Sequence, residues 1–304
     1  MKNIYTLLSI VIISLTVYLS FDDLMPSSVK SIESTGFSVE NALNHLKVIT
    51  KEPHYTSSYY HQEVQNYIIN ELDKMGLETE IQNQVVLSSR RVGTNAANII
   101  GTIKGSGSGK SLLLLTHYDS SAHSSFGASD AGSGIATILE GVRAFLSKNI
   151  IPLNDIHVVF TDAEEIGLLG AEAFVKNHKL IDNVGLVLNF EARGSGGPSY
   201  MLMETNGINS KLISEFANAN PRFPAANSLM YSIYKMLPND TDLTVFREQA
   251  NINGFNFAFI GDHFDYHTSL DTYERLDRNT LLHQADYFMS MVNHFSKSDL
   301  SNLN

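Results

Sequence analysis

The chain has 304 residues and 43% of them are hydrophobic, which is enough to bury the core of one large domain or two small ones. A formal net charge of −11, without any strongly basic run, argues against a nucleic-acid partner. The lack of cysteine excludes disulfides, thiolate zinc ligands and a cysteine nucleophile. Any metal ion therefore has to be held by His, Asp and Glu, a set that suits a hydrolytic zinc site better than a structural one.

Residues 1–21 are unlike the rest of the chain. Residues 4–21 are apolar apart from scattered Ser, Thr and Tyr, with Lys2 before them and two acids after them. Their length, about 17–20 residues, is the minimum for crossing a bilayer, and the flanking charges favour a cytoplasmic N-terminus. We expect an uncleaved membrane anchor. The alternative is a cleaved signal peptide, which the lack of an A-x-A-like site disfavours. Either way, we expect the remainder to be exported to the periplasmic, extracellular or lumenal side.

Residues 22–37 are polar and contain Pro26 and several Ser, so we predict a linker that leads to one domain, 38–304. Two amphipathic helices are expected at 38–50 and 59–75. Partial alternation of apolar and polar residues predicts strands at 79–86 and 98–103. The glycine-rich run that follows, 105–109, lacks the strand–loop–helix context of a phosphate-binding loop and is interpreted as a turn.

The rest of the chain alternates between apolar strands and helices. Continuous apolar strands in this order are typical of a mostly parallel sheet that helices cover on both faces, so the sequence predicts an α/β domain. The expected strands are 111–116, 156–161, 184–190 and 254–260, and the expected helices are 130–146, 168–177, 210–219 and 277–295.

Polar residues follow these strands directly. Each has a simple interpretation when taken alone: Asp130 could cap a helix, the Glu164-Glu165 pair could favour a first helical turn, and Glu191 could pair with Arg193. Functional groups in open α/β sheets, however, gather just beyond the carboxyl ends of the strands, so these residues should converge. The set comprises His117 and Asp119, Glu164 and Glu165, Glu191 and His267, with Asp130 at the start of a helix.

Clustered carboxylates would repel one another, and these segments contain a single Arg, so divalent cations are the expected relief. Two metal ions need a bridging carboxylate and two terminal ligands each. Asp130 can bridge. His117 with Glu191 can complete one site, and Glu165 with His267 the other. Glu164 is free to act as general base, and Asp119 suits the role of fixing the ligand imidazole of His117.

These residues resemble the di-zinc aminopeptidase family of peptidase clan MH, which also contains glutamate carboxypeptidases and glutaminyl cyclases. The resemblance rests on His117-Tyr118-Asp119, on Ser129-Asp130-Ala131-Gly132, on Glu164-Glu165 followed by Gly167-Leu168-Leu169-Gly170, and on Glu191 and His267. It implies two zinc ions per chain, with Asp130 as bridge, Glu165 as a ligand and Glu164 as the base. The implied fold is a three-layer α/β/α sandwich around a mixed, mostly parallel sheet of about eight strands, the zinc exopeptidase fold.

The finer resemblance is to the membrane metallopeptidases of the endoplasmic reticulum and vacuole and their bacterial relatives. It rests on the segment 189–198 around Glu191, on Asp240-Thr241-Asp242, on Tyr266-His267-Thr268 with Asp271-Thr272, and on Pro53-His54. By position, His54, Arg193, Asp242 and Tyr266 are candidate substrate contacts. His263 is the main rival of His267 for the last ligand position.

The resemblance implies a zinc-dependent exopeptidase, foremost an aminopeptidase that removes N-terminal residues from a peptide substrate with water activated by two metal ions. Three alternatives stay open: a carboxypeptidase, a glutaminyl-peptide cyclotransferase on the same scaffold, and a non-catalytic, membrane-anchored binding domain. The presence of all five ligand candidates and of Glu164 argues against the last.

Overall fold

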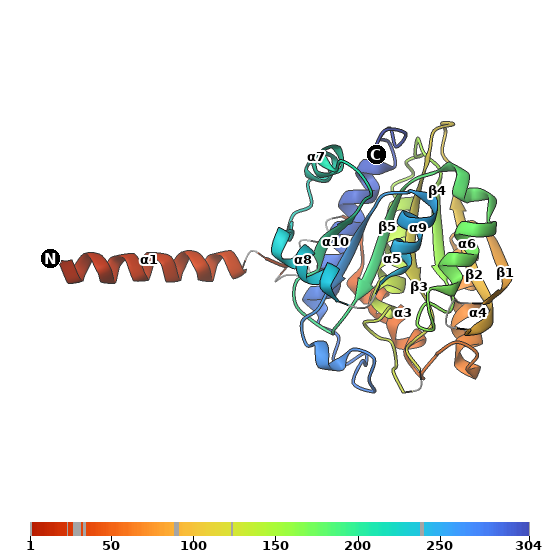
Figure 1. Ribbon diagram of the computed structural model, residues 1–304, viewed down its shortest axis with the longest axis horizontal. Coiled ribbons are helices and arrows are strands. Elements are labelled where there is room, and N and C mark those ends of the chain that lie inside the picture. The colour runs from red at the N-terminus through yellow and green to blue at the C-terminus, as the bar shows by residue number, and fades with distance from the viewer. Residues whose placement is uncertain are drawn as a thin grey trace.

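A computed structural model describes residues 2–22, 24–26, 32, 35–87, 91–122, 124–237 and 240–303. Within them, a seven-stranded mixed sheet lies between two layers of helices (Figure 1). The strand order across the sheet is β1-β2-β4-β3-β5-β7-β6. The strands are β1 (Glu78–Leu87), β2 (Gly93–Ile103), β3 (Ser111–His117), β4 (Ile156–Thr161), β5 (Val184–Ala192), β6 (Tyr200–Glu204) and β7 (Gly254–Phe259).

The four central strands, β4, β3, β5 and β7, run parallel, and the outer pairs β1–β2, β2–β4 and β6–β7 are antiparallel. Central strands covered on both faces have no polar side, which is why β3 is buried along its whole length. Leu112 and Leu114 pack into the core on one face, and Leu113 and Leu115 into the core on the other. Parallel neighbours bring their carboxyl ends to the same edge of the sheet.

Two helical layers complete the sandwich (Figure 1). The larger core joins one face of the sheet to five helices, and a smaller core joins the other face to two. An eighth helix covers the β6–β7 edge. The first layer holds α3 (Val39–Ile49), α4 (Tyr59–Lys74), α5 (Gly132–Leu146), α7 (Ser210–Ala219) and α10 (Arg278–Phe295); the second holds α6 (Leu169–Asn177) and α9 (Asp242–Ala250); α8 (Ser228–Met236) lies at the edge. Two 3₁₀ helices, η1 (Lys179–Asn183) and η2 (His263–Asp265), join other elements.

The predicted three-layer α/β/α architecture is confirmed, with two corrections. The sheet has seven strands within the described residues rather than about eight, and half of its strand pairs are antiparallel. The short edge strand β6 and the helices α8 and α9 were not predicted individually. In addition, α5 begins at Gly132, so that Asp130 precedes the helix and Ala131 is its N-cap.

The N-terminal helix α1 (Lys2–Asp22) projects from the domain (Figure 1). Its apolar side chains are largely exposed: Ile4, Leu7 and Ile13 are 58%, 61% and 62% exposed. Among the described residues, the structure contains no helix with both the length and the hydropathy to cross a bilayer. Much of the predicted linker 22–37, namely residues 23, 27–31, 33 and 34, lies outside the described residues. Ile32 and Phe37, by contrast, are buried in the larger core.

Candidate metal centre

The register of the sheet sets three polar side chains in one row at its carboxyl edge. His117, the last residue of β3, pairs with Thr161, the last residue of β4. On the other side Leu115 pairs with Asn189, and two residues further along each strand come His117 and Glu191. Residues in register point to the same face of a sheet. The side chains of Thr161, His117 and Glu191 therefore stand next to one another, and His117 Nε2 lies 3.7 Å from Glu191 Oε2.

Asp130 links this row to a second group of side chains. Its Oδ1 lies 3.2 Å from His117 Nε2, and its Oδ2 lies 3.1 Å from His267 Nε2. The same nitrogen of His267 lies 3.0 Å from Glu165 Oε2. Two donor sets therefore share Asp130: one with His117 and Glu191, the other with Glu165 and His267. The structure thus brings all five predicted ligands together.

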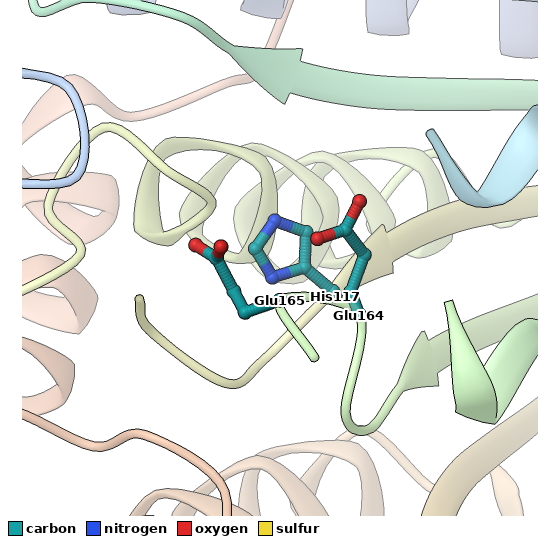
Figure 2. A group of neighbouring side chains, drawn as sticks. All are labelled: His117, Glu164 and Glu165. Atoms are coloured by element: carbon teal, nitrogen blue, oxygen red, sulfur yellow. The ribbon is translucent and has the colours of Figure 1, made fainter. Parts of the chain in front are cut away.

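Glu164 occupies the space beside both predicted donor sets. Figure 2 shows the imidazole of His117 between the carboxyl groups of Glu164 and Glu165. These three residues also form a group in which one ligand atom from each lies within 4.8 Å of the others. Glu164 is thus within reach of the cluster without belonging to either of the sets that share Asp130.

The donor atoms fit a divalent metal. Buried polar atoms normally have hydrogen-bond partners, yet Glu165 Oε1 and Glu191 Oε1 are buried and have none within the part of the chain that the structure describes. His117, Asp130 and Glu191 are each at least 95% buried. Imidazole nitrogens and carboxylate oxygens around an open position are the ligands of hydrolytic zinc sites. His267, with 35% of its side chain exposed, leaves the cluster accessible from solvent.

The titration of these groups reflects crowded negative charge. Burial raises the pKa of Glu165 to about 8, and the nearby Asp130 adds to that rise. Burial alone would lower the pKa of His267, but hydrogen bonds to Asp130 and Glu165 raise it to about 10. Burial also raises the pKa of Glu164 well above its usual range, with Glu191 and Glu165 contributing in the same direction. The cluster therefore requires positive charge, from protons or from a cation.

Asp119 contacts both halves of the centre, through its main-chain oxygen and through its carboxylate. The ring nitrogen Nδ1 of His117 lies 2.8 Å from the main-chain oxygen of Asp119, and its distance to the carboxylate oxygen Oδ1 is 3.7 Å. The carboxylate instead accepts hydrogen bonds from the main-chain N–H groups of Glu164 and Glu165, at 3.0 and 3.3 Å, and from the hydroxyl of Thr56 at 3.0 Å. It therefore positions the Glu-Glu pair, while its carbonyl orients the imidazole.

Asp271 does the same for the loop that carries Asp130. Its carboxylate accepts hydrogen bonds from the N–H groups of Ser129 at 2.7 Å and of Asp130 at 3.2 Å. The sequence resemblance included Asp271 but assigned it no role. Because α5 starts only at Gly132, the carboxylate of Asp130 is not used as a helix cap and faces the two histidines.

The remaining candidates lie at different distances from the cluster. Asp242 is fully buried and accepts a hydrogen bond from the hydroxyl of Thr161. The ring of Tyr266 stacks on that of His267, with centroids 3.6 Å apart. His54 is buried under the Asp130 loop, and its backbone is hydrogen-bonded to Ser120. His263 belongs to none of the donor groups among the described residues.

A mixed α/β/α sheet with imidazole and carboxylate donors at its carboxyl edge is the arrangement expected of a metallopeptidase. The comparisons are specific: residues 98–292 match Peptidase family M28, and the chain belongs to that family. It is 30% identical over 268 residues to the vacuolar membrane protease of Candida dubliniensis, covering 84% of this chain and 28% of that protein. It is 28% identical to human endoplasmic reticulum metallopeptidase 1, covering 64% of this chain and 21% of that protein.

The solved structures with this fold include more than one kind of enzyme. A Zn-dependent exopeptidase from Parabacteroides distasonis superposes with a TM-score of 0.68 at 20% identity, over 84% of this chain and 98% of that one. A glutaminyl cyclase from Porphyromonas gingivalis superposes with a TM-score of 0.67 at 20% identity, over 85% and 97%. The resemblance drawn from the motifs is thus confirmed. The chain spans between a fifth and a third of the length of the curated relatives described above.

Proposed function

We propose that this protein is a zinc-dependent exopeptidase that removes N-terminal residues from peptides, with two zinc ions in the centre described above. The observation that carries the proposal is the position of Asp130, whose two carboxylate oxygens face two histidines from two different donor sets. One zinc would be held by His117, Asp130 and Glu191, and the other by Asp130, Glu165 and His267. Zinc supplies a Lewis acid that polarises the scissile carbonyl and lowers the pKa of water.

The chain's own residues would move the proton. One Oε atom of the Glu164 carboxylate would accept a proton from the attacking water. Glu164 would then donate this proton to the leaving amine. The free α-amine of the substrate is a cation, and the buried carboxylates around the centre favour it electrostatically.

The decisive experiment is a digestion of mixed peptides by the zinc-loaded protein, followed by mass spectrometry. Shortening from the N-terminus that stops on addition of a chelator and returns with zinc is the expected result. Shortening from the C-terminus would make the protein a carboxypeptidase.

A second candidate function is glutaminyl cyclisation, favoured by the likeness in fold to a glutaminyl cyclase. Two complete donor sets around Asp130 support the peptidase instead. Peptides that begin with glutamine separate the two functions, because cyclisation lowers the peptide mass by one ammonia and leaves the chain length unchanged. A protein that alters no peptide with either zinc or chelator would be a binding domain.

The N-terminal segment 1–21 would carry the domain out of the cytoplasm, as an anchor or as a signal peptide. Two observations support this. The apolar side chains of α1 are exposed, and the relative from Candida dubliniensis is named a membrane protease. The mass of the mature N-terminus and the fraction that resists carbonate extraction from membranes distinguish the two.

A further inference from the structure

The strand β1 forms one edge of the sheet, and its outer side has no partner strand within the described residues (Figure 1). The strand is 10 residues long, and its other side pairs with β2 along the full length. In an antiparallel pair, alternate residues direct their N–H and C=O groups away from the partner strand. The outer side of β1 therefore presents a row of hydrogen-bonding groups that a further strand can pair with.

One face of β1 turns towards α6 and the other towards solvent. Val86 belongs to a small core with residues of α6, and Gln82 donates a hydrogen bond to the backbone of that helix at 3.0 Å. Side chains alternate between the two faces of a strand, so Ile81, Val85 and Leu87 share the opposite face. They are 41%, 78% and 69% exposed. A strand added at this edge would cover apolar side chains together with the free backbone groups.

The segment 81–87 lacks the features that normally protect an exposed edge strand. Edge strands are usually kept from pairing by charged residues, proline or a bulge. This segment contains no charged residue and no proline, although the chain has a net charge of −11, and its register with β2 is unbroken. An uncharged segment with high strand propensity associates readily when it is left exposed. The composition therefore indicates that another strand covers this edge.

The sequence of β1 is complementary to itself. If a second copy of the chain places its β1 antiparallel to the first, with the two-fold axis at Asn83, residues equally far from the axis lie opposite each other. On the exposed face, Asn83 then meets the Asn83 of the second copy, Ile81 meets Val85, and Thr79 meets Leu87. Apolar β-branched pairs and amide pairs of this kind stabilise neighbouring strands.

The same alignment keeps acidic groups apart on the other face. Gln82 lies opposite Gln84, and Glu80 lies opposite Val86, so within residues 79–87 no carboxylate meets another across the axis. Like charges directly opposite each other would destabilise the pair. A register shifted by one residue would place Ile81 opposite Gln84 and would turn the two exposed faces to opposite sides of the sheet. The alignment about Asn83 is therefore favoured by both faces.

We propose that β1 is a dimerisation strand, which pairs antiparallel with the β1 of a second copy about Asn83 and joins the two sheets into one. The inference goes beyond the proposed peptidase function and does not depend on it. The two-fold axis reverses the direction of every strand in the second copy. The carboxyl edges of the two sheets therefore face opposite ways, and both metal centres stay accessible.

Disulfide mapping tests this alignment, because the chain has no cysteine of its own. Opposite residues in an antiparallel pair have Cα atoms about 4.5–5.5 Å apart, which a disulfide can span. The full chain with Asn83→Cys, in detergent micelles with copper phenanthroline as oxidant, should form a covalent dimer on non-reducing gels. Val85→Cys alone should not, because its two copies would lie about 14 Å apart along the strand. Co-expressed Ile81→Cys and Val85→Cys chains should cross-link to each other.

A charge on the exposed face should separate the two copies. Val85→Lys places a lysine opposite Ile81 on both sides of the axis, so the dissociation constant of the dimer should rise about tenfold or more. Sedimentation of the full chain in detergent measures this constant, and an unchanged zinc content shows that the variant is folded. Ile208, which is 81% exposed in the loop between β6 and α7, provides the matched controls. Ile208→Lys should leave the dissociation constant unchanged, and Ile208→Cys should not cross-link.

Three results would overturn the dimer. The first is a wild type that sediments as a monomer. The second is an Asn83→Cys chain that forms disulfides no faster than Ile208→Cys, together with a Val85→Lys dimer of wild-type strength, because the copies would then associate elsewhere. The third is a monomer whose β1 amides become protected from hydrogen exchange only when a peptide is added, which would assign the edge to a different partner. A dimer that cleaves no peptide would overturn the proposed function alone.

Discussion

The carboxylate of Asp119 accepts a hydrogen bond from the main-chain N–H of Glu164 at 3.0 Å. Through this bond, an acidic residue that follows β3 fixes the position of one that follows the neighbouring strand β4. The same carboxylate holds Glu165, and the carbonyl of Asp119 holds His117. Predicted ligands of both zinc ions, and the predicted base, are therefore oriented from a single residue.

Removing one of the two acceptor oxygens of Asp119 should loosen the whole centre. Asp119→Asn retains one acceptor oxygen and presents an N–H₂ group to a main-chain N–H, so we expect zinc affinity to fall about 10- to 100-fold. Competition with a chromophoric chelator measures this. Asp155→Asn is the matched control, because Asp155 also accepts a main-chain N–H, from Gly105, far from the centre. Equal zinc affinity in Asp119→Asn and wild type would contradict the positioning role.

Glu164→Gln should abolish turnover while zinc remains bound. The amide cannot take up a proton, so kcat should fall about 10²- to 10⁴-fold. Steady-state kinetics together with metal analysis of the same sample check both parts. Glu172→Gln, which changes a glutamate paired with Lys176 on the outside of α6, should keep full activity. A Glu164→Gln protein with wild-type kcat would remove Glu164 from the mechanism.

Zinc stoichiometry should follow the two donor sets. The wild type should bind two zinc ions, and His117→Ala and His267→Ala should each retain one, because each breaks one set. Asp130→Ala removes the residue that the sets share and should weaken both. Inductively coupled plasma mass spectrometry after dialysis counts the ions. One tightly bound zinc in the wild type would instead favour a single-metal enzyme, and a His263→Ala variant that loses zinc would reverse the choice of His267.

The metal-free protein should lose stability as pH rises. The pKa of Glu165 is raised to about 8 and that of His267 to about 10 in the folded chain. Both are higher than in the unfolded chain, so both contributions are present below about pH 4.5 to 6.5 and are lost as pH rises towards 8 and 10. Thermal melts with chelator should therefore show a falling Tm over this range. Zinc needs deprotonated ligands, so the increase in Tm that it causes should grow with pH.

A close contact behind the centre should make Gly134 intolerant of a side chain. A Cβ at this position of α5 would lie 2.3 Å from Thr116 Oγ1 and 2.6 Å from the main-chain oxygen of Phe190, next to His117 and Glu191. Gly134→Ala should push α5 away from the sheet, lower stability by about 1–3 kcal/mol and reduce activity. Gly207→Ala, where a Cβ meets nothing within 4 Å, is the control. Equal Tm values for the two variants would show that α5 and the sheet accommodate the added methyl group without loss of stability.

The alternation of the central strands with helices and the identity of the five metal-binding candidates follow from the sequence. Apolar strands that lead into His117, Glu165 and Glu191 are local patterns. The chemistry of clustered carboxylates does not depend on the path of the chain between them. The edge strand β6 escaped prediction because an edge strand is defined by its partner β7 and not by a period of its own.

What only the tertiary structure decided is which groups meet. Asp119 and Glu164 lie 45 residues apart in the chain, and the bond between them exists because β3 and β4 are parallel neighbours in register. The choice of His267 over His263 depends on a loop that turns one imidazole towards Asp130. The row of Thr161, His117 and Glu191 depends on the pairing of β4, β3 and β5. Residues that are distant in sequence meet at one site only because their strands pair in a particular register. A sequence pattern describes one strand at a time and does not contain that pairing.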